Sequence, residues 1–149
     1  MKICTDASVV VKWFKKGEAK EKFALKLKDN VLDEKVSLIC SEWVLLEVIR
    51  ALTKIRYPEE KIKDTETFLL GLEAGGFVEI VNISSVRKLT SEIIYKLNLY
   101  ASDAVILATA LHKKVDLITE DEHLLKKRVI NYAKKNKLKI LTLDQAIKM

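Results

Sequence analysis

Residues 99–125 read LYASDAVILATALHKKVDLITEDEHLL, and this stretch decides the fold. Seven of the eight residues 104–111 are apolar, so the helix expected here has no face that favours water and should be buried. Ser102 or Asp103 stands before this run, where a helix cap belongs. Residues 115–119 then read as a strand. A buried helix that leads straight into a strand indicates a sheet with helices packed against it.

Expected strands and helices alternate along the whole chain. Each expected strand is short and mostly apolar throughout, which is typical of a parallel sheet covered by helices on both faces. The strands are expected at 2–5, 36–40, 77–82, 115–119 and 139–143. The helices between them are expected to begin at the capping residues Ser8, Ser41 and Ser84 or Ser85, and one more after Pro58. We therefore expect a three-layer α/β fold with a parallel sheet of about five strands, in a single domain over residues 1–149.

Composition excludes several classes of protein. Hydrophobic residues make up 49% and charged residues 32% of the chain, which argues against disorder. Asp6 and Lys12 interrupt the apolar start, so no signal peptide is expected, and no uncharged apolar run approaches the ~20 residues of a membrane span. Cys4 and Cys40 are expected to be buried free thiols in a reducing cytoplasm, although a disulfide stays open if their strands are neighbours.

The chain carries a net charge of +6, which suits a polyanionic partner such as a nucleic acid. A lysine excess with a single glutamine, Gln145, is also typical of proteins from hyperthermophiles. Lys12, Lys15 and Lys16 follow Asp6 and are candidates for phosphate contacts or for an ordinary solvated face. Charge alone leaves both interpretations open.

Four acids stand at positions where a structural role and a functional role compete. Asp6 and Asp121 follow the first and fourth expected strands, where each is also a candidate helix cap. Asp103 opens the buried helix, where the helix dipole favours it. Glu47 shares a helix face with apolar residues and must be paired with a base such as Arg50, protonated or bound to a metal. Because strand ends of a parallel sheet meet at one rim, we expect these acids to converge.

Carboxylates without cysteine or histidine nearby favour Mg²⁺ or Mn²⁺ over zinc. His112 and His123 have no ligand spacing and read as ordinary surface residues. No phosphate-binding glycine loop and no nucleophile elbow is present. Bound Mg²⁺ can activate water and neutralise charge on a phosphate, which indicates metal-assisted phosphodiester hydrolysis. Four neighbouring carboxylates also repel one another, so at least one pKa should lie above about 4.

These residues resemble a known family, the PIN-domain ribonucleases, and within it the VapC toxins of toxin–antitoxin pairs. The motifs are DAS at 6–8, EWVLLEVIRAL at 42–52, SDAVILATAL at 102–111 and TED at 119–121. The resemblance implies an endoribonuclease that depends on Mg²⁺ or Mn²⁺. It carries over Asp6, Glu47, Asp103 and Asp121 as catalytic metal ligands, with Ser8 and Thr119 as supporting hydroxyls and Glu120 as a substitute or competitor for Asp121.

The resemblance also implies an RNA substrate, a homodimer and a small inhibitory antitoxin protein. The helix after Pro58 supports the dimer independently, because its run of Phe68, Leu69, Leu70 and Leu72 is more apolar surface than one side of a helix can bury in a small domain. The dimer would use this helix and the one before it. The alternative function is a non-catalytic RNA-binding or assembly module with the same fold.

Overall fold

A computed structural model describes all 149 residues and shows a five-stranded sheet. Its strand order is β3-β2-β1-β4-β5, and every neighbouring pair is parallel. The strands are β1 (Lys2–Thr5), β2 (Ser37–Ser41), β3 (Val78–Val81), β4 (Leu117–Ile118) and β5 (Ile140–Leu141). The predicted α/β fold with a parallel sheet of about five strands is confirmed.

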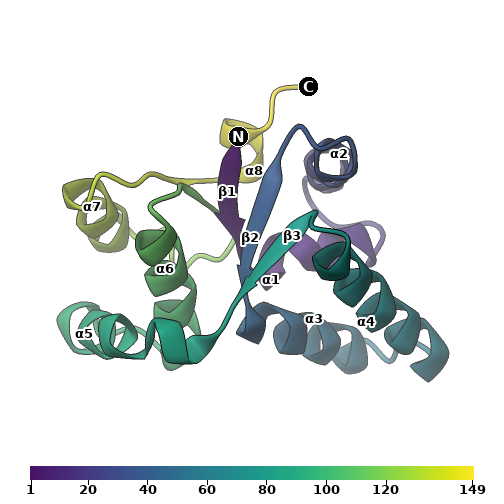
Figure 1. Ribbon diagram of the computed structural model, residues 1–149, viewed down its shortest axis with the longest axis horizontal. Coiled ribbons are helices and arrows are strands. Elements are labelled where there is room, and N and C mark those ends of the chain that lie inside the picture. Colours follow the sequence, from purple (N-terminus) through teal and green to yellow (C-terminus); the bar gives the residue numbers. More distant parts are fainter.

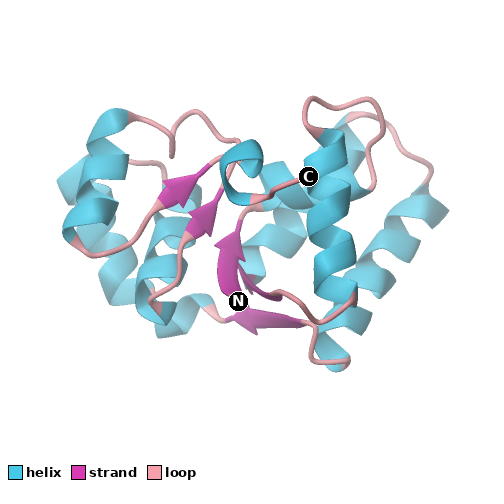
Figure 2. Cartoon of the chain, turned by 90° about the horizontal axis from the view of Figure 1, so that it is seen from above, coloured by secondary structure: helices cyan, strands magenta, loops and turns pink.

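Helices cover both sides of this sheet (Figure 1). One group contains α5, α6 and α7, and the other contains α2, α3 and α4, with the strands running between them in the view from above (Figure 2). The helical elements are α1 (Ala7–Val10), η1 (Val11–Trp13), α2 (Glu21–Leu32), α3 (Glu42–Lys54), α4 (Glu59–Ala74), η2 (Ile83–Ser85), α5 (Arg87–Leu97), α6 (Ala101–Lys113), α7 (Lys127–Lys135) and α8 (Leu143–Ala146).

Helix α6 is the buried helix that the sequence predicts. Residues 104–110 are all buried, and five of them belong to one continuous core of 38 residues that spans the sheet and both helix groups. Thr109 is the one polar residue in 104–110, and its hydroxyl is satisfied because Oγ1 donates to the carbonyl oxygen of Val105 at 2.7 Å. One continuous core agrees with a single domain, which stays a prediction.

The strand register brings the ends of β1 and β4 together. Thr5 pairs with Ile118, and the fully buried Thr5 hydroxyl donates to the Ile118 carbonyl oxygen at 3.0 Å. Asp6 and Thr119, the next residues of the two strands, are therefore neighbours. Strands β1 and β2 run in the same direction, toward α1 and α3 (Figure 1), so the start of α3 lies at the same rim.

Ser41 is the cap of α3 as expected, since its hydroxyl accepts from the Trp43 amide at 3.2 Å. The other serine caps are wrong. Ser8 lies inside α1, which begins at Ala7, and Ser84 and Ser85 belong to η2, before α5 begins. Neither α1 nor α5 has a side-chain cap bond, so packing rather than capping chemistry sets their first residues.

Two starts around the central stretch also differ from expectation. Helix α6 begins at Ala101, two or three residues earlier than a cap at Ser102 or Asp103 would place it, and Tyr100 is an extended N-cap residue that makes no side-chain cap bond. Asp121 begins no helix, because a turn follows it and α7 starts at Lys127. The Asp121 carboxylate instead accepts from the His123 amide at 2.7 Å and so stabilises that turn.

Cys4 and Cys40 are both buried and free, as predicted. Burial raises the pKa of both thiols, that of Cys40 to about 12, so they stay protonated and unreactive at neutral pH. None of the helices has the length and apolar character that a membrane crossing requires.

Candidate active site

Asp6 follows β1 and is almost fully buried. Its Oδ1 accepts from the Ser8 hydroxyl at 2.6 Å and its Oδ2 from the Thr119 hydroxyl at 2.5 Å. Burial raises the pKa of Asp6 to about 6; the two hydroxyl bonds oppose this rise, and the nearby Asp121 carboxylate adds to it. The side chain makes no cap hydrogen bond to α1, although the Ser8 backbone amide makes the smallest contribution to lowering its pKa, so helix capping is not the main contact of this buried carboxylate.

Two hydroxyls fix the acids that follow β1 and β4. Thr119 Oγ1 donates to Asp6 and accepts from the Asp121 amide at 3.0 Å. Ser8 Oγ donates to Asp6 and accepts from the Glu120 amide at 2.9 Å. Each hydroxyl therefore joins the segment after β1 to the segment after β4, which keeps Asp6 and Asp121 at one rim of the sheet.

Glu47 comes to this rim from the second turn of α3. Its Oε1 is buried and has no hydrogen-bond partner. No ion pair joins it to Arg50 or to any other base, so the structural alternative does not hold. Burial raises the pKa of Glu47 to about 7, and the carboxylates of Asp6, Asp103 and Asp121 add to the rise.

Asp103 lies in the first turn of α6 and completes the set. Burial raises its pKa, the Asp121 carboxylate raises it further, and His123 opposes the rise. The pKa values of Asp6, Glu47 and Asp103 are all raised, chiefly by burial, and neighbouring acids add to each rise in the direction that the sequence predicts. Glu47 is thus within electrostatic reach of the other three acids, and Asp121 acts on Asp6, Glu47 and Asp103.

Glu120 is occupied elsewhere. Its carboxylate accepts from the Leu143 amide at 2.7 Å and pairs with the Lys20 ammonium at 3.0 Å. Lys20 also pairs with Asp144 at 2.6 Å, so these contacts tie the loop after β4 to α2 and α8. They do not fit the interpretation of Glu120 as a substitute for Asp121.

Two of the three lysines after Asp6 are also occupied. Lys12 is buried and lies 3.9 Å from the Glu18 carboxylate, and Lys15 forms an ion pair with the same residue. These pairs disfavour phosphate contacts by Lys12 and Lys15, which the sequence left open.

Basic and aromatic residues that the sequence reasoning did not assign lie beside Asp103. A cleft of about 290 Å³ is lined there by Tyr100, Asp103, His123, Lys126 and others. The His123 ring meets the Tyr100 ring edge-on, with centroids 5.7 Å apart. Sequence spacing held a signal for both, since His123 comes two residues after Asp121 and Tyr100 three residues before Asp103.

The donor types at the rim fit a hard divalent cation. No three histidine, cysteine, aspartate or glutamate side chains lie close enough together to hold one metal ion in this arrangement. Yet four carboxylates that repel one another, with a buried Glu47 oxygen that lacks a partner, form a set that Mg²⁺ or Mn²⁺ would satisfy. A cation would replace this repulsion by attraction.

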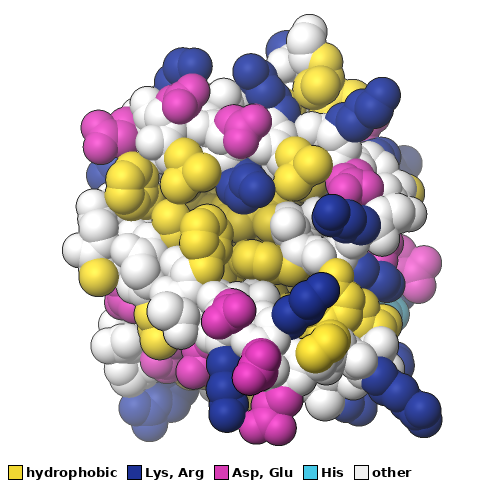
Figure 3. All heavy atoms as spheres, turned by 90° about the vertical axis from the view of Figure 1, so that its right-hand side faces the viewer, with side chains coloured by type: hydrophobic (Ala, Val, Ile, Leu, Met, Phe, Trp, Pro, Cys, Tyr) yellow, Lys and Arg dark blue, Asp and Glu magenta, His cyan; other side chains and the backbone are white.

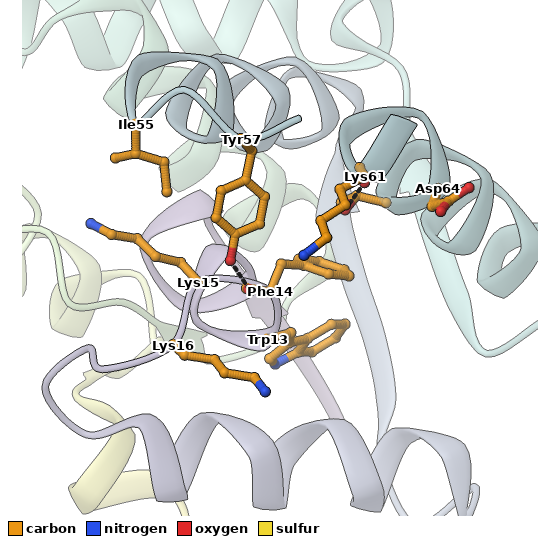
Figure 4. A pocket seen from close by; sticks show the side chains of 9 residues that line it. Trp13, Phe14, Lys15, Lys16, Ile55, Tyr57, Lys61 and Asp64 are labelled. Atoms are coloured by element: carbon orange, nitrogen blue, oxygen red, sulfur yellow. Dashed lines mark hydrogen bonds between the residues drawn. The ribbon is translucent and has the colours of Figure 1, made fainter. Parts of the chain in front are cut away.

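A second, larger cleft of about 610 Å³ lies between η1, the end of α3 and α4. Hydrophobic side chains gather at the centre of the face that contains α2 and α4, with charged side chains around them (Figure 3). In Figure 4, Trp13, Phe14 and Tyr57 form the inner wall, and the Tyr57 hydroxyl donates to the Phe14 carbonyl oxygen at 2.6 Å. Lysines stand at its edge: Lys15, Lys16 and Lys61. None of the four rim acids lines this cleft.

A family model described as PIN domain matches residues 3–130. The fold is similar to that of solved structures. "Structure of FitAB bound to IR36 DNA fragment" has a TM-score of 0.67 at 16% identity, covering 95% of this chain and 94% of the other. VapBC2 from Rickettsia felis, bound to a promoter DNA fragment, has a TM-score of 0.66 at 17% identity, covering 95% of this chain and 98% of the other. A toxin–antitoxin complex from Klebsiella pneumoniae has a TM-score of 0.64 at 18% identity, covering 96% of this chain and 98% of the other. No curated protein matches the sequence.

Proposed function

We propose that this chain, which belongs to the PIN domain family, is a metal-dependent endoribonuclease that hydrolyses RNA phosphodiester bonds. One observation carries the proposal: Glu47 has a buried carboxylate oxygen without a hydrogen-bond partner, and it lies within electrostatic reach of Asp6, which follows β1, of Asp103 on α6 and of Asp121 after β4. No ion pair accounts for the acid at Glu47. A bound cation would compensate its charge and that of its acidic neighbours.

Asp6, Glu47, Asp103 and Asp121 would hold Mg²⁺ or Mn²⁺. The bound cation would activate water and neutralise charge on the phosphate. The protein's own groups supply the preorganisation: the Ser8 and Thr119 hydroxyls hold both oxygens of Asp6, and the Thr119 hydroxyl also holds the Asp121 backbone. A single side chain, Thr119, therefore bonds both to the Asp6 carboxylate and to the Asp121 backbone.

We also propose that the protein is the toxin of a VapBC-type pair and acts in the cytoplasm. Support comes from the fold shared with FitAB and VapBC2 and from the buried free thiols. We propose that the large cleft of Figure 4 binds a small antitoxin protein. Its apolar wall of Trp13, Phe14 and Tyr57 and its lysine edge suit a segment that combines apolar and acidic side chains.

The proposed assembly also includes a homodimer formed through α3 and α4. The expected apolar surface is only partly buried within the chain, because Leu69 and Leu72 face the core while Leu70 is 46% exposed. Leu46 on α3 is 61% exposed. Large exposed apolar side chains on two neighbouring helices favour a protein–protein contact.

Asp103→Asn tests the proposed activity. This substitution keeps the size of the side chain and removes its charge, so we expect RNA cleavage in Mg²⁺ or Mn²⁺ to fall by roughly 100-fold or more, while the circular-dichroism spectrum stays native. Asp29→Asn, on the exposed face of α2, is the matched control. Cleavage should be measured with purified protein and mixed RNAs, with EDTA as the metal-free arm.

Near-wild-type cleavage by Asp103→Asn would rule out the assigned site. RNA binding without any cleavage by the wild-type protein would favour the non-catalytic RNA-binding module instead.

A further inference from the structure

The cleft beside Asp103 is built from three segments that meet at the carboxylate rim. They are the residues after α5, the start of α6 and the turn before α7, and their lining side chains include Asn98, Tyr100, Asp103, His123, Lys126 and Arg128. Asp103 belongs both to this cleft and to the acid set. Whatever occupies the cleft therefore lies directly next to the proposed point of cleavage.

The charge of the cleft is positive apart from Asp103. Neither Lys126 nor Arg128 takes part in an ion pair. Arg128 is held in place because its Nη1 donates to the Leu97 carbonyl oxygen, and this bond leaves its charge uncompensated. Two uncompensated cations beside one carboxylate favour an anionic group such as a phosphate.

An aromatic ring stands at the same cleft. Tyr100 is 71% exposed although it lies at the N-cap of α6, and its ring meets the His123 ring edge-on at a centroid distance of 5.7 Å and an interplanar angle of 89°. The contact orients the tyrosine ring and leaves most of it open to solvent. An oriented, exposed aromatic ring beside free cations is the combination with which proteins bind single-stranded nucleic acids.

We propose that this cleft binds an unpaired nucleotide adjacent to the phosphate that is cleaved, with its base stacked on Tyr100 and its phosphate bound by Lys126 and Arg128. The proposal rests on the proposed ribonuclease function and assigns Tyr100, Lys126 and Arg128 to the binding of the neighbouring nucleotide. A base inside a duplex is already stacked and paired, so it has no face to offer to Tyr100.

Fluorescence anisotropy with a labelled RNA, as a single strand and as a duplex, tests this inference in EDTA, where cleavage does not interfere. We expect the wild type to prefer the single strand and Tyr100→Ala to weaken its binding by about 5- to 100-fold. Tyr100→Phe, which keeps the aromatic face, should bind like wild type. Tyr95→Ala is the matched control, because Tyr95 is 74% exposed on α5 and does not line the cleft.

Salt titration tests the cationic part. Lys126→Gln should reduce the slope of log K against log salt concentration by about 0.7, the value for one phosphate contact to a single strand. Lys22→Gln, an exposed unpaired lysine of α2 on the other side of the sheet, should change it much less.

The possible outcomes separate the inference from the proposed function. Equal RNA binding by Tyr100→Ala and Tyr95→Ala, or equal slopes for Lys126→Gln and Lys22→Gln, overturns the nucleotide site even if the wild type cleaves RNA. Selective loss in Tyr100→Ala together with absence of cleavage in Mg²⁺ and Mn²⁺ supports the nucleotide site and overturns the ribonuclease. Equal affinity for single strand and duplex overturns the preference for unpaired nucleotides.

Discussion

At the scale of single residues, Glu47 is the clearest sign of function. A buried carboxylate oxygen without a hydrogen-bond partner lowers stability, and three further acids beside it lower stability again when they are ionised. Asp6 is different, because the Ser8 and Thr119 hydroxyls satisfy both of its oxygens. Asp6 is therefore supported for structure as well as for chemistry, while nothing in the fold itself accounts for an acid at Glu47.

Glu47→Gln tests this asymmetry through the pH dependence of stability. Burial and the neighbouring acids raise the pKa of Glu47 from 4.5 to about 7, so between these values the folded protein holds a proton that the unfolded chain has released. Stability contributed by this proton is lost as the pH rises toward and through 7. The free energy of unfolding of Glu47→Gln should therefore be about 1 to 2 kcal/mol higher than that of wild type at pH 8. This difference in stability should shrink toward pH 5.

Urea denaturation at several pH values measures this gap. Glu73→Gln, which removes the same charge from an exposed and unpaired position on α4, corrects for the change in net charge. A constant difference between Glu47→Gln and Glu73→Gln at all pH values would contradict the raised pKa of Glu47.

At the scale of elements, the alternation of apolar segments was sufficient to predict the parallel sheet, the buried α6 and the strand ends that carry the acids. Helix starts were less predictable. A serine before a helical pattern predicts a cap, and at Ser41 the structure has that cap bond. Ser8 looks the same in the sequence, but its hydroxyl bonds to Asp6 and Glu120. The contacts of Glu120 to Lys20 and Leu143 join segments distant in the sequence, so a single sequence could not supply them, whereas the spacing of His123 from Asp121 was visible in it.

Ser41→Ala tests the cap of α3, the helix that carries Glu47. Ser41 is fully buried and its hydroxyl satisfies the Trp43 amide, so the substitution should lower the free energy of unfolding by about 1 kcal/mol. Ser37→Ala on the same strand makes a matched control, because the Ser37 hydroxyl forms no hydrogen bond and the residue is only partly buried. Chemical denaturation that finds both variants equally stable would contradict a capping role for Ser41.

At the scale of the whole molecule, the two clefts divide the surface between two proposed partners. The cleft beside Asp103 lies among α5, α6 and the turn before α7. The large cleft lies among η1, α3 and α4, in the other helix group (Figure 1). The net charge of +6 is then not uniformly available to RNA, because lysines such as Lys12, Lys15 and Lys20 pair with acids.

The proposed homodimer is tested by light scattering at micromolar concentration, where we expect twice the 17.0 kDa mass of the chain. Leu46→Lys and Leu70→Lys place charges on the exposed apolar surface of α3 and α4 and should produce monomers, because burying an unpaired charge in an interface is costly. Leu32→Lys, at the end of α2, alters a residue of similar exposure outside the proposed interface. A monomeric wild type would refute the dimer.

The most direct test of the cation site is the melting temperature of the wild type and of Asp103→Asn, with and without Mn²⁺. A ligand that binds only the folded protein adds about 2.7 kcal/mol at a hundredfold excess over Kd, so wild type should gain roughly 5 to 10 °C. Without metal, Asp103→Asn should be as stable as wild type or slightly more so, because it relieves repulsion, and it should gain much less from Mn²⁺. The result that would contradict the account is an absence of any Mn²⁺ shift in wild type, together with a lower melting temperature for Asp103→Asn in metal-free buffer.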